Sequence, residues 1–456
     1  MGLISRNPYT GQVMKEFEAQ TLEDSIREAK KSREAFLRWR KASTAERAGF
    51  LRPISKLLRA QQRSFAETIT REMGKPVTQS LAEIEKCAWL IDYFAENSPL
   101  LLREETVATE ALRSYIAFEP LGLILGIMPW NFPFWQVFRF AIPALMSGNV
   151  CLLKHASNVP ATALTIEGVF KDSGVPDHVF KTLLVDPGVA MQLVEREVVD
   201  GVSLTGSVEA GSQIAALAGR HLKKFVLELG GSDPFLVLED ADIPGAARLA
   251  VQARLINSGQ SCIAAKRFIV KSAVAEPFLR AVEREIQAVK MGDPLDPETT
   301  VGPLTKQELV ATLSGQLEDA KRKGAQVTEG PSPPPGKGFF FRPAVVSKVT
   351  RDMRLLKEEV FGPVMPVLAA GSDEELIEEA NASAYGLGAS IWTPDLARAE
   401  ALARKLEAGF VAINDIVKSD PRLPFGGIKK SGIGRELSPY GLKEFVNIKS
   451  VVIKGA

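Results

Sequence analysis

Hydrophobic residues recur at helical spacing through the N-terminal part of the chain. The spacing predicts two amphipathic helices within residues 22–70 and a third helix over residues 77–97. Gly74-Lys75-Pro76 separates the second helix from the third, and Ser98-Pro99 ends the third. Over residues 105–119 the pattern changes to that of an extended hairpin.

From residue 121 onwards, short apolar runs alternate with helical patterns. The pattern predicts strands over residues 121–127, 149–154, 201–205 and 225–229, and helices over residues 160–173 and 207–219. Such alternation is typical of a parallel, doubly wound sheet that is covered by helices.

A second α/β region begins near Pro234. We expect it to contain helices over residues 242–258 and 273–289 and strands over residues 265–270, 345–349 and 410–413. The final segment, residues 444–452, ends in an apolar extended run. Such a run indicates a strand that pairs with a neighbouring element or subunit.

The composition is that of an ordinary globular protein. The chain has 456 residues, of which 45% are hydrophobic and 24% charged, and this length suggests two or three domains. Its net charge of +1 gives no reason to expect nucleic acid or a membrane as a partner. The most apolar run, residues 121–128, is much shorter than the roughly 20 residues that span a bilayer. We therefore expect a cytoplasmic protein.

The chain contains three cysteines and three histidines, which argues against both a disulfide framework and a metal site. Cys87 lies in a helical pattern and Cys151 in a strand pattern, so both are expected in the core. Cys262 instead ends the small, polar run that begins at Asn257, which suits an exposed turn. A thiol in such a turn is a candidate nucleophile. The alternative is that Cys262 is simply a small buried residue.

Two further polar residues could assist a nucleophilic thiol. Glu228 ends an apolar strand, and a carboxylate in apolar surroundings has a raised pKa that suits a general base. The alternative for Glu228 is a salt bridge to Lys223 or Lys224. Asn131 is enclosed by two prolines and two aromatic residues in the segment 129–133, and a rigid amide there could donate a hydrogen bond to an oxyanion. The alternative for Asn131 is a structural turn.

A third motif favours phosphate binding. The predicted strand 201–205 leads into Gly206-Ser207 at the start of a helix, where backbone N–H groups and the helix dipole attract anions. Many helices begin with Gly-Ser, so this motif alone does not identify a site.

Together these motifs resemble those of the aldehyde dehydrogenase superfamily, and the resemblance extends over nearly the whole chain. The matching segments, in chain order, are Pro129–Pro133, Leu204–Ser207, Leu227–Gly231, Gly259–Cys262, Glu358–Pro363, Asn381, Tyr385–Leu387 and Pro424–Gly432.

The resemblance implies an α/β, aldehyde dehydrogenase-like fold in three parts. A doubly wound, parallel-sheet dinucleotide-binding domain would be formed by residues 1–104 and 120–231, and a second α/β catalytic domain by residues 232–430. Residues 105–119 and 431–456 would form a small β oligomerisation element, so a homodimer or homotetramer is expected.

The resemblance also implies a reaction. Cys262 would attack an aldehyde to give a thiohemiacetal, with Asn131 and the Cys262 N–H stabilising the oxyanion. Hydride would pass to NAD or NADP, and Glu228 would activate the water that hydrolyses the resulting thioester. Relatives that transfer the acyl group to coenzyme A usually lack this glutamate, so its presence favours hydrolysis.

The residues that the resemblance assigns to the cofactor are Trp130, Lys154, Ser157, Thr205, Gly206, Ser207, Leu229, Glu359 and Phe361. Lys154 matches a lysine that contacts the adenosine ribose. Members that prefer NAD commonly carry a glutamate where this chain has Ser157. A serine removes the repulsion of a 2′-phosphate and leaves Lys154 to pair with it, so we expect NADP to be preferred over NAD.

Arg139 and Ser419 match residues that bind the distal carboxylate in succinate-semialdehyde dehydrogenases, and Arg422 adds a cation nearby. The alternative for Arg139 is a surface salt bridge. A second carboxylate-binding arginine is expected where Ile256 stands, and whether Arg254 can replace it stays open at this point.

The leading hypothesis is therefore the oxidation of succinate semialdehyde to succinate. Glutarate semialdehyde, lactaldehyde or aliphatic aldehydes are the alternatives within the same reaction. A cofactor-independent thiol esterase is an alternative of another class, because Cys262, Glu228 and Asn131 would also serve acyl transfer. A protein that keeps the fold without catalysis is the third.

Overall fold

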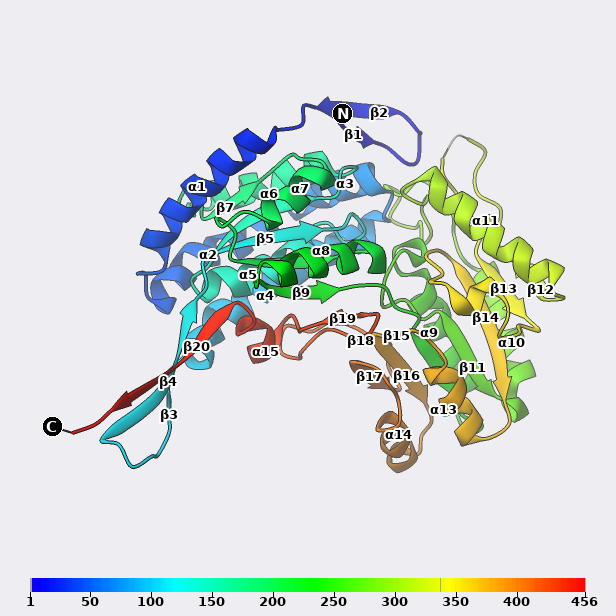
Figure 1. The fold of residues 1–456 in the computed structure, drawn as a ribbon. Helices are drawn as coiled ribbons and strands as arrows, with labels where there is room; N and C mark the ends of the chain where they lie inside the picture. The colour runs from blue at the N-terminus through cyan, green and yellow to red at the C-terminus, as the bar shows by residue number, and fades with distance from the viewer. Residues whose placement is uncertain (1, 337, 456) are drawn as a thin grey trace.

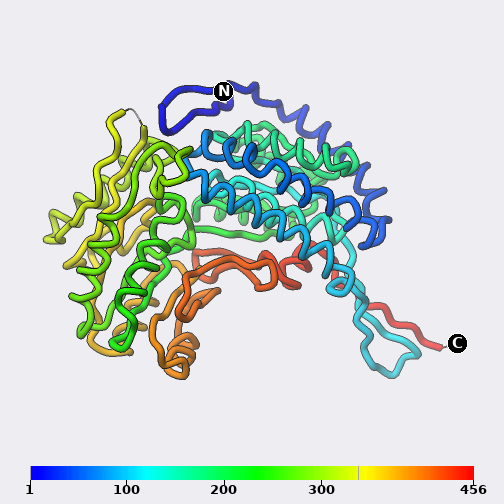
Figure 2. Tube along the Cα trace, turned by 180° about the vertical axis from the view of Figure 1, so that it is seen from behind, coloured from blue at the N-terminus to red at the C-terminus, as the bar shows by residue number. Residues whose placement is uncertain are grey.

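A computed structural model describes residues 2–336 and 338–455, and what was expected of Met1, Lys337 and Ala456 lies outside these residues. Two α/β layers lie side by side, and a narrow arm projects from the first layer (Figure 1, Figure 2). The chain begins with an antiparallel pair of strands, β1 (Leu3–Arg6) and β2 (Val13–Phe17).

Four helices follow where the sequence predicts three. They are α1 (Leu22–Trp39), α2 (Thr44–Ala60), α3 (Gln62–Met73) and α4 (Val77–Leu101). The expected second helix is divided at Gln61, where φ of −114° and ψ of 22° interrupt the helix. Thr21 and Ser43 each begin a helix with a capping box.

Helix α4 continues past Ser98-Pro99, where the sequence predicts its end. Pro99 has no N–H, so the Ala95 carbonyl loses its partner within the helix. The Arg52 side chain of α2 replaces that partner, because its Nη2 donates to the Ala95 oxygen at 3.3 Å. A tertiary contact therefore compensates for the proline and allows the final turn.

The first sheet contains the strands expected after residue 121. Its order is β19-β9-β8-β5-β6-β7, and all neighbours are parallel except β19. The strands are β5 (Leu123–Met128), β6 (Val150–His155), β7 (Phe180–Thr182), β8 (Gly201–Thr205), β9 (Lys224–Glu228) and β19 (Gly432–Ile433). The connecting helices are α5 (Trp135–Met146), α6 (Pro160–Asp172), α7 (Pro187–Val194) and α8 (Val208–Arg220).

The chain order reverses between β5 and β8, which are direct neighbours in this sheet. In open α/β sheets, ligands bind outside the carboxyl ends of the strands at such a reversal. The loops that follow β5 and β8 carry Asn131 and Gly206-Ser207, and the fold therefore brings two of the predicted motifs to one edge.

The second sheet has the order β12-β13-β14-β11-β10-β16-β17, with only β12 antiparallel. Its strands are β10 (Pro234–Val237), β11 (Arg267–Lys271), β12 (Gln326–Glu329), β13 (Ala344–Ser347), β14 (Val364–Ala370), β16 (Gly388–Trp392) and β17 (Phe410–Ile413). Its helices are α9 (Ile243–Leu255), the 3₁₀ turn η1 (Ile256–Gly259), α10 (Ser272–Gln287), α11 (Gln307–Arg322), α12 (Arg354–Lys357), α13 (Asp373–Asn381) and α14 (Leu396–Ala403). The α/β prediction with parallel sheets is thus confirmed.

The C-terminal segment returns from the second layer to the first. It contains β18 (Ile428–Lys429), which pairs with β15 (Tyr385–Gly386), then β19, α15 (Ser438–Leu442) and β20 (Val446–Ile453). Within the described part of the chain, none of the helices combines the length and apolar character needed to cross a membrane.

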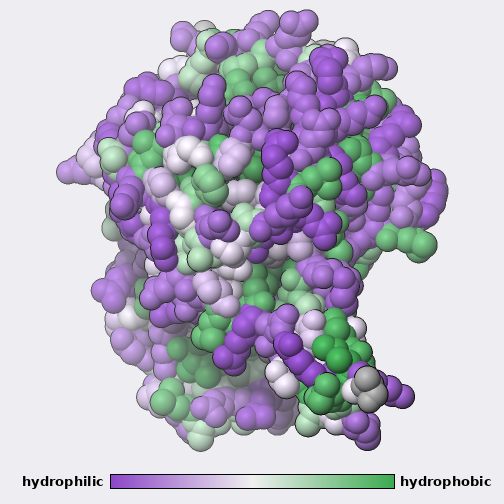
Figure 3. Space-filling view, turned by 90° about the vertical axis from the view of Figure 1, so that its left-hand side faces the viewer, coloured by the Kyte–Doolittle hydropathy of each residue, from purple (hydrophilic) through white to green (hydrophobic). Residues whose placement is uncertain are grey.

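The arm joins the predicted hairpin to the predicted terminal strand. β20 pairs antiparallel with β4 (Arg113–Pro120), and β4 pairs with β3 (Glu105–Thr106). Figure 3 shows hydrophobic surface at the lower end of the molecule, over this sheet. Leu112, Ile448 and Val452 are 76%, 59% and 62% exposed. The domain boundaries stated above stay predictions.

The contact between Arg52 and the Ala95 carbonyl should be worth about 1 kcal/mol. We expect Arg52→Met to lower the free energy of unfolding by that amount in urea titrations followed by circular dichroism. In a Pro99→Ala background the residue 99 N–H again reaches the Ala95 oxygen, so the same substitution should cost less. Equal costs in the two backgrounds would contradict this account of the last turn.

Candidate active site

Cys262 lies in the loop that connects η1 to β11. Three successive residues before it adopt positive φ angles: 51° at Asn257, 56° at Ser258 and 81° at Gly259. Such a conformation is unfavourable for residues with a side chain and persists only where surrounding contacts enforce it. Asn257 and Ser258, which lie shortly before Cys262, both adopt this unfavourable conformation. The loop is therefore held in a specific conformation by its surroundings.

Side-chain hydrogen bonds hold this loop. The Asn257 Nδ2 donates to the Asn131 carbonyl at 2.7 Å and to the Gln260 carbonyl at 3.1 Å. Ser258 Oγ donates to the Gly302 carbonyl at 3.1 Å and accepts from the Gly302 N–H at 3.0 Å. A Cβ on Gly259 would lie 2.5 Å from the Gly362 oxygen, so only glycine fits there.

Asn131 is the partner of this loop from the first sheet. Its Nδ2 donates to the Gln260 carbonyl at 3.1 Å, and its side chain is 5% exposed. The amide of Asn131 has two N–H bonds, so one remains for a further acceptor. The structure thus places the predicted amide beside the loop that carries Cys262.

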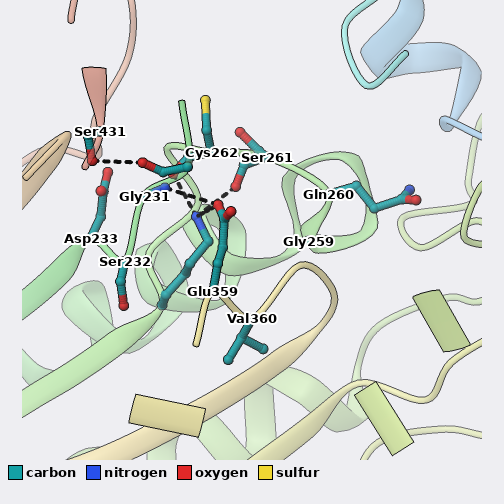
Figure 4. Close-up of polar contacts among 12 residues, drawn as sticks. Gly231, Ser232, Asp233, Gly259, Gln260, Ser261, Cys262, Glu359, Val360 and Ser431 are labelled. Atoms are coloured by element: carbon teal, nitrogen blue, oxygen red, sulfur yellow. Dashed lines mark hydrogen bonds and ion pairs between the residues drawn. The ribbon is translucent and has the colours of Figure 1, made fainter. Parts of the chain in front are cut away.

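Cys262 differs from the other two cysteines. Cys87 and Cys151 are fully buried core residues, as expected, whereas Cys262 is only partly buried. Its sulfur points away from the side on which Glu359 approaches the loop (Figure 4). Burial raises the pKa of the Cys262 thiol to about 12, although the charges of Lys266 and Arg139 act in the opposite direction.

Two cavities meet at Cys262 and Gln136. One has a volume of about 200 Å³ and the other about 240 Å³. The alternative of a sealed core cysteine does not describe this position, because Cys262 lines both cavities. A nucleophile at this junction can contact two molecules, one in each cavity.

The larger cavity gathers most of the residues that the sequence assigned to the cofactor. Its lining includes Trp130, Asn131, Thr205, Gly206, Ser207, Leu229, Glu359 and Phe361. Trp130 and Phe361 meet edge to face, with ring centroids 5.8 Å apart. Ser207 caps α8 by accepting from the Ala210 N–H at 3.2 Å, and the N-terminus of that helix faces this edge of the sheet.

Glu359 reaches the cavity from the segment between α12 and β14. Its Oε1 accepts from the Gly231 N–H at 3.0 Å and lies 3.4 Å from the Lys266 ammonium. A Cβ on Gly230 would lie 2.5 Å from the other carboxylate oxygen, so glycine makes this approach possible. The other lone pairs of the Glu359 carboxylate can accept hydrogen bonds from hydroxyl groups in the cavity.

Lys154 and Ser157 lie near the same edge but, among the described residues, do not line this cavity. Lys154 is the second-to-last residue of β6 and is 6% exposed, and Ser157 follows in the next loop. Burial lowers the pKa of Lys154 to about 8; the charge of Asp186 opposes this shift and that of Lys306 adds to it. Burial also lowers the pKa of Lys306. Lys306 is a second cation here that the sequence patterns did not single out.

Glu228 ends β9 and is 2% exposed. Burial raises its pKa well above the ordinary value, against the charge of Arg139. The predicted alternative, a salt bridge to Lys223 or Lys224, does not occur among the described residues, because Lys223 donates to backbone carbonyls and Lys224 pairs with Glu444. Glu228 itself lines neither cavity within the described chain.

The smaller cavity lies between α4, α5 and the loop before β18. Its lining includes Lys86, Trp135, Arg139, Ile256, Cys262, Ser419 and Phe425. Arg139 and Ser419, two of the predicted substrate residues, are therefore brought together with Cys262. Arg422 is not, because it is exposed and paired with Asp420 at 2.6 Å.

Arg139 is neither free nor at the surface. It is 2% exposed, forms an ion pair with Glu436, and donates to Thr205 Oγ1 at 3.4 Å. The alternative of a surface salt bridge is thus wrong, since the pair is buried. Most of the charge of Arg139 is compensated by Glu436.

Arg254 does not replace the arginine that the sequence lacks at Ile256. It is fully buried and donates to the carbonyls of Ala265 at 3.0 Å and Val360 at 2.8 Å. Its role in the structure is to hold backbone carbonyls near the loop, while Ile256 itself lines the smaller cavity.

Residues 3–451 match the family model described as the aldehyde dehydrogenase family. The chain belongs to the aldehyde dehydrogenase family. It is 45% identical to the probable succinate-semialdehyde dehydrogenase (NADP+) of Synechocystis sp., covering 99% of this chain and 100% of that one. It is 44% identical to the succinate semialdehyde dehydrogenase (NAD(P)+) Sad of Escherichia coli, covering 98% and 97%.

Solved structures of the family share the whole fold. The succinic semialdehyde dehydrogenase of Streptococcus pyogenes, in complex with NADP+, superposes with a TM-score of 0.97 at 35% identity, covering 99% of this chain and 100% of that one. The predicted aldehyde dehydrogenase-like fold is therefore confirmed.

The raised pKa of Cys262 makes a prediction about its reactivity in the ligand-free protein. Only the thiolate reacts with iodoacetamide. With a pKa of about 12, the alkylation rate should rise about tenfold per pH unit between pH 7 and pH 10. The measurement is mass spectrometry of Cys262 over time, with Cys262→Ser as the control for the buried cysteines. A plateau already at pH 8 would contradict it.

Proposed function

We propose that this protein oxidises succinate semialdehyde to succinate with reduction of NADP, and accepts NAD less well. The observation that carries the proposal is the junction at Cys262, where a cavity suited to a dinucleotide meets a cavity that contains cations. The named relatives in Synechocystis and Escherichia coli support the same substrate.

The groups around the larger cavity fit a dinucleotide. The Glu359 carboxylate can accept from ribose hydroxyls, and the first-turn N–H groups of α8 suit a pyrophosphate. Trp130 and Phe361 provide apolar walls. A bound nicotinamide supplies the acceptor for the hydride that leaves the aldehyde carbon.

The chain itself supplies the nucleophile and the oxyanion contacts. We propose that Cys262 Sγ loses its proton to solvent and bonds to the aldehyde carbon, that the carbonyl π electrons move to the oxygen, and that this oxyanion accepts from Asn131 Nδ2 and the Cys262 N–H. Asn131 is oriented for this by Asn257 and Gln260, so it does not have to be ordered when the charge develops. After hydride loss, the substrate is held as a thioester on Cys262.

Glu228 is the proposed base for hydrolysis of that thioester. Its raised pKa gives it a proton affinity suited to taking a proton from water. One buried oxygen, Oε1, has no hydrogen-bond partner among the described residues, and Gly426 leaves space beside it, since a Cβ there would lie 2.6 Å from this oxygen. Water attack then releases succinate and restores the Cys262 thiol.

The preference for NADP rests on Lys154, Ser157 and Lys306. Lys154 interacts with the Asp186 carboxylate and repels Lys306, and an anion beside the two lysines would reduce that repulsion. Ser157 adds a hydroxyl without negative charge. A 2′-phosphate would meet two cations here.

Other aldehydes are the second candidates, namely glutarate semialdehyde, lactaldehyde and aliphatic aldehydes. The apolar walls of the smaller cavity, Trp135, Ile256 and Phe425, would accept their carbon chains equally well. A cofactor-independent thiol esterase is less well supported, because it would leave the groups of the larger cavity without a role.

Steady-state assays at the nicotinamide absorbance test the proposal. We expect kcat/KM for succinate semialdehyde to exceed that for butanal and lactaldehyde, and to be higher with NADP than with NAD. Ser157→Glu should reduce the NADP-to-NAD ratio of kcat/KM at least about tenfold, because the added carboxylate repels the 2′-phosphate. A higher kcat/KM for a neutral aldehyde, or an unchanged ratio in Ser157→Glu, would contradict the respective part.

We also propose that the arm mediates assembly into a homodimer or homotetramer. Its exposed apolar residues and the open edge of β20 suit a contact between copies of the chain. Light scattering after gel filtration should give a mass of at least twice 49.5 kDa. Val452→Lys, which charges the arm, should shift the mass towards the monomer, and a wild-type monomer would contradict the proposal.

A further inference from the structure

Lys86 is a cation in the smaller cavity that none of the recognised motifs contains. It comes from α4 and lines the cavity together with Cys262 and Ser419. Its Nζ donates to Ser419 Oγ at 2.7 Å and lies 4.3 Å from the centre of the Trp135 ring. The indole face and the hydroxyl therefore fix the position of the ammonium group.

No carboxylate forms an ion pair with Lys86 among the described residues. Glu83, on the same helix, pairs with Lys75 and accepts the N–H groups of Phe134 and Trp135 at 2.9 Å each. Asp420, next to Ser419, is paired with Arg422.

Arg139, another cation of the cavity, differs from Lys86. Its guanidinium is paired with the buried Glu436, so little net positive charge remains for a ligand. Lys86 has only neutral partners, a hydroxyl and an aromatic ring. An anion that enters this cavity therefore gains more from Lys86 than from Arg139.

The charged form of Lys86 is disfavoured in this cavity. Burial, and then the repulsion of Arg139, lower its pKa to about 8, while Cys87, Asp420 and Glu83 act in the opposite direction. Lys418 and Cys262 also line this cavity. A partly desolvated ammonium group that has no ion-pair partner gains from the approach of an anion.

We infer that Lys86 Nζ, together with the Ser419 hydroxyl, binds the distal carboxylate of the substrate while its aldehyde faces Cys262. The inference rests on the proposed function and deepens it, because it assigns the selection of a carboxylate-bearing aldehyde to a specific cation. Lys86 thereby takes the place of the second arginine that is absent at Ile256.

The test compares succinate semialdehyde with butanal, a neutral aldehyde of the same chain length, at saturating NADP. The measured quantity is the ratio of kcat/KM for the two substrates, in which any loss of folded protein cancels. We expect Lys86→Met to lower this ratio at least about tenfold. Lys86→Arg keeps the charge and should keep the ratio within about threefold.

Lys56→Met is the matched control, because it removes an exposed lysine of α2 that lines neither cavity. Its ratio should equal that of the wild type within about threefold. A ratio in Lys56→Met as low as that in Lys86→Met would mean that general attraction of the anion, rather than Lys86, selects the substrate.

The pH dependence gives a readout that a merely structural lysine would not produce. Lys86 is charged below a pKa of about 8 and neutral above it, so the wild-type ratio should fall as pH rises from 7 to 10. In Lys86→Arg the ratio should stay constant over this range. Titration of Cys262 affects both substrates and cancels in the ratio.

The outcomes separate the two proposals. A wild-type protein that does not prefer succinate semialdehyde over butanal overturns the proposed function and, with it, the role of Lys86. A wild-type preference that persists in Lys86→Met overturns the role of Lys86 alone. A preference that is lost in Lys86→Met and retained in Lys86→Arg supports both.

Discussion

A reciprocal pair of amide contacts between the two α/β layers determines where the chemistry can occur. The Asn257 side chain donates to the Asn131 backbone, and the Asn131 side chain donates to the Gln260 backbone. Asn131 follows a strand of the first sheet, whereas Asn257 and Gln260 precede a strand of the second. Because these bonds are buried, breaking one leaves polar groups without water or partner. The position of Cys262 relative to the first sheet therefore depends on them.

Much of the site could be predicted because its motifs directly follow strands. The carboxyl ends of parallel strands lie at one edge of a sheet, so Asn131, Gly206 and Glu228 had to come close once the strands were recognised. The chemistry of each residue type then limited its role. The starts of α1 and α2 are also set locally, since Thr21 and Ser43 provide capping boxes.

The rest depended on contacts between residues far apart in the chain. The last turn of α4 requires Arg52, which lies outside that helix. The compensation of Arg139 by Glu436 and the availability of Lys86 could not be read from spacing. One signal did exist for Lys86: it directly precedes Cys87 and Ala88, two apolar residues that are buried on the same helix. A lysine among buried apolar residues usually has a specific partner or ligand.

The arm is anchored at the end of the first sheet that lies opposite to Cys262. The Phe445 carbonyl, directly before β20, accepts from Asn149 Nδ2 at 2.9 Å, at the beginning of β6. The reacting groups gather beyond the carboxyl ends of the same strands. The contact between the arm and the sheet is thus separated from Cys262 by the length of the strands. Substitutions in the arm should consequently leave the contacts around Cys262 unchanged.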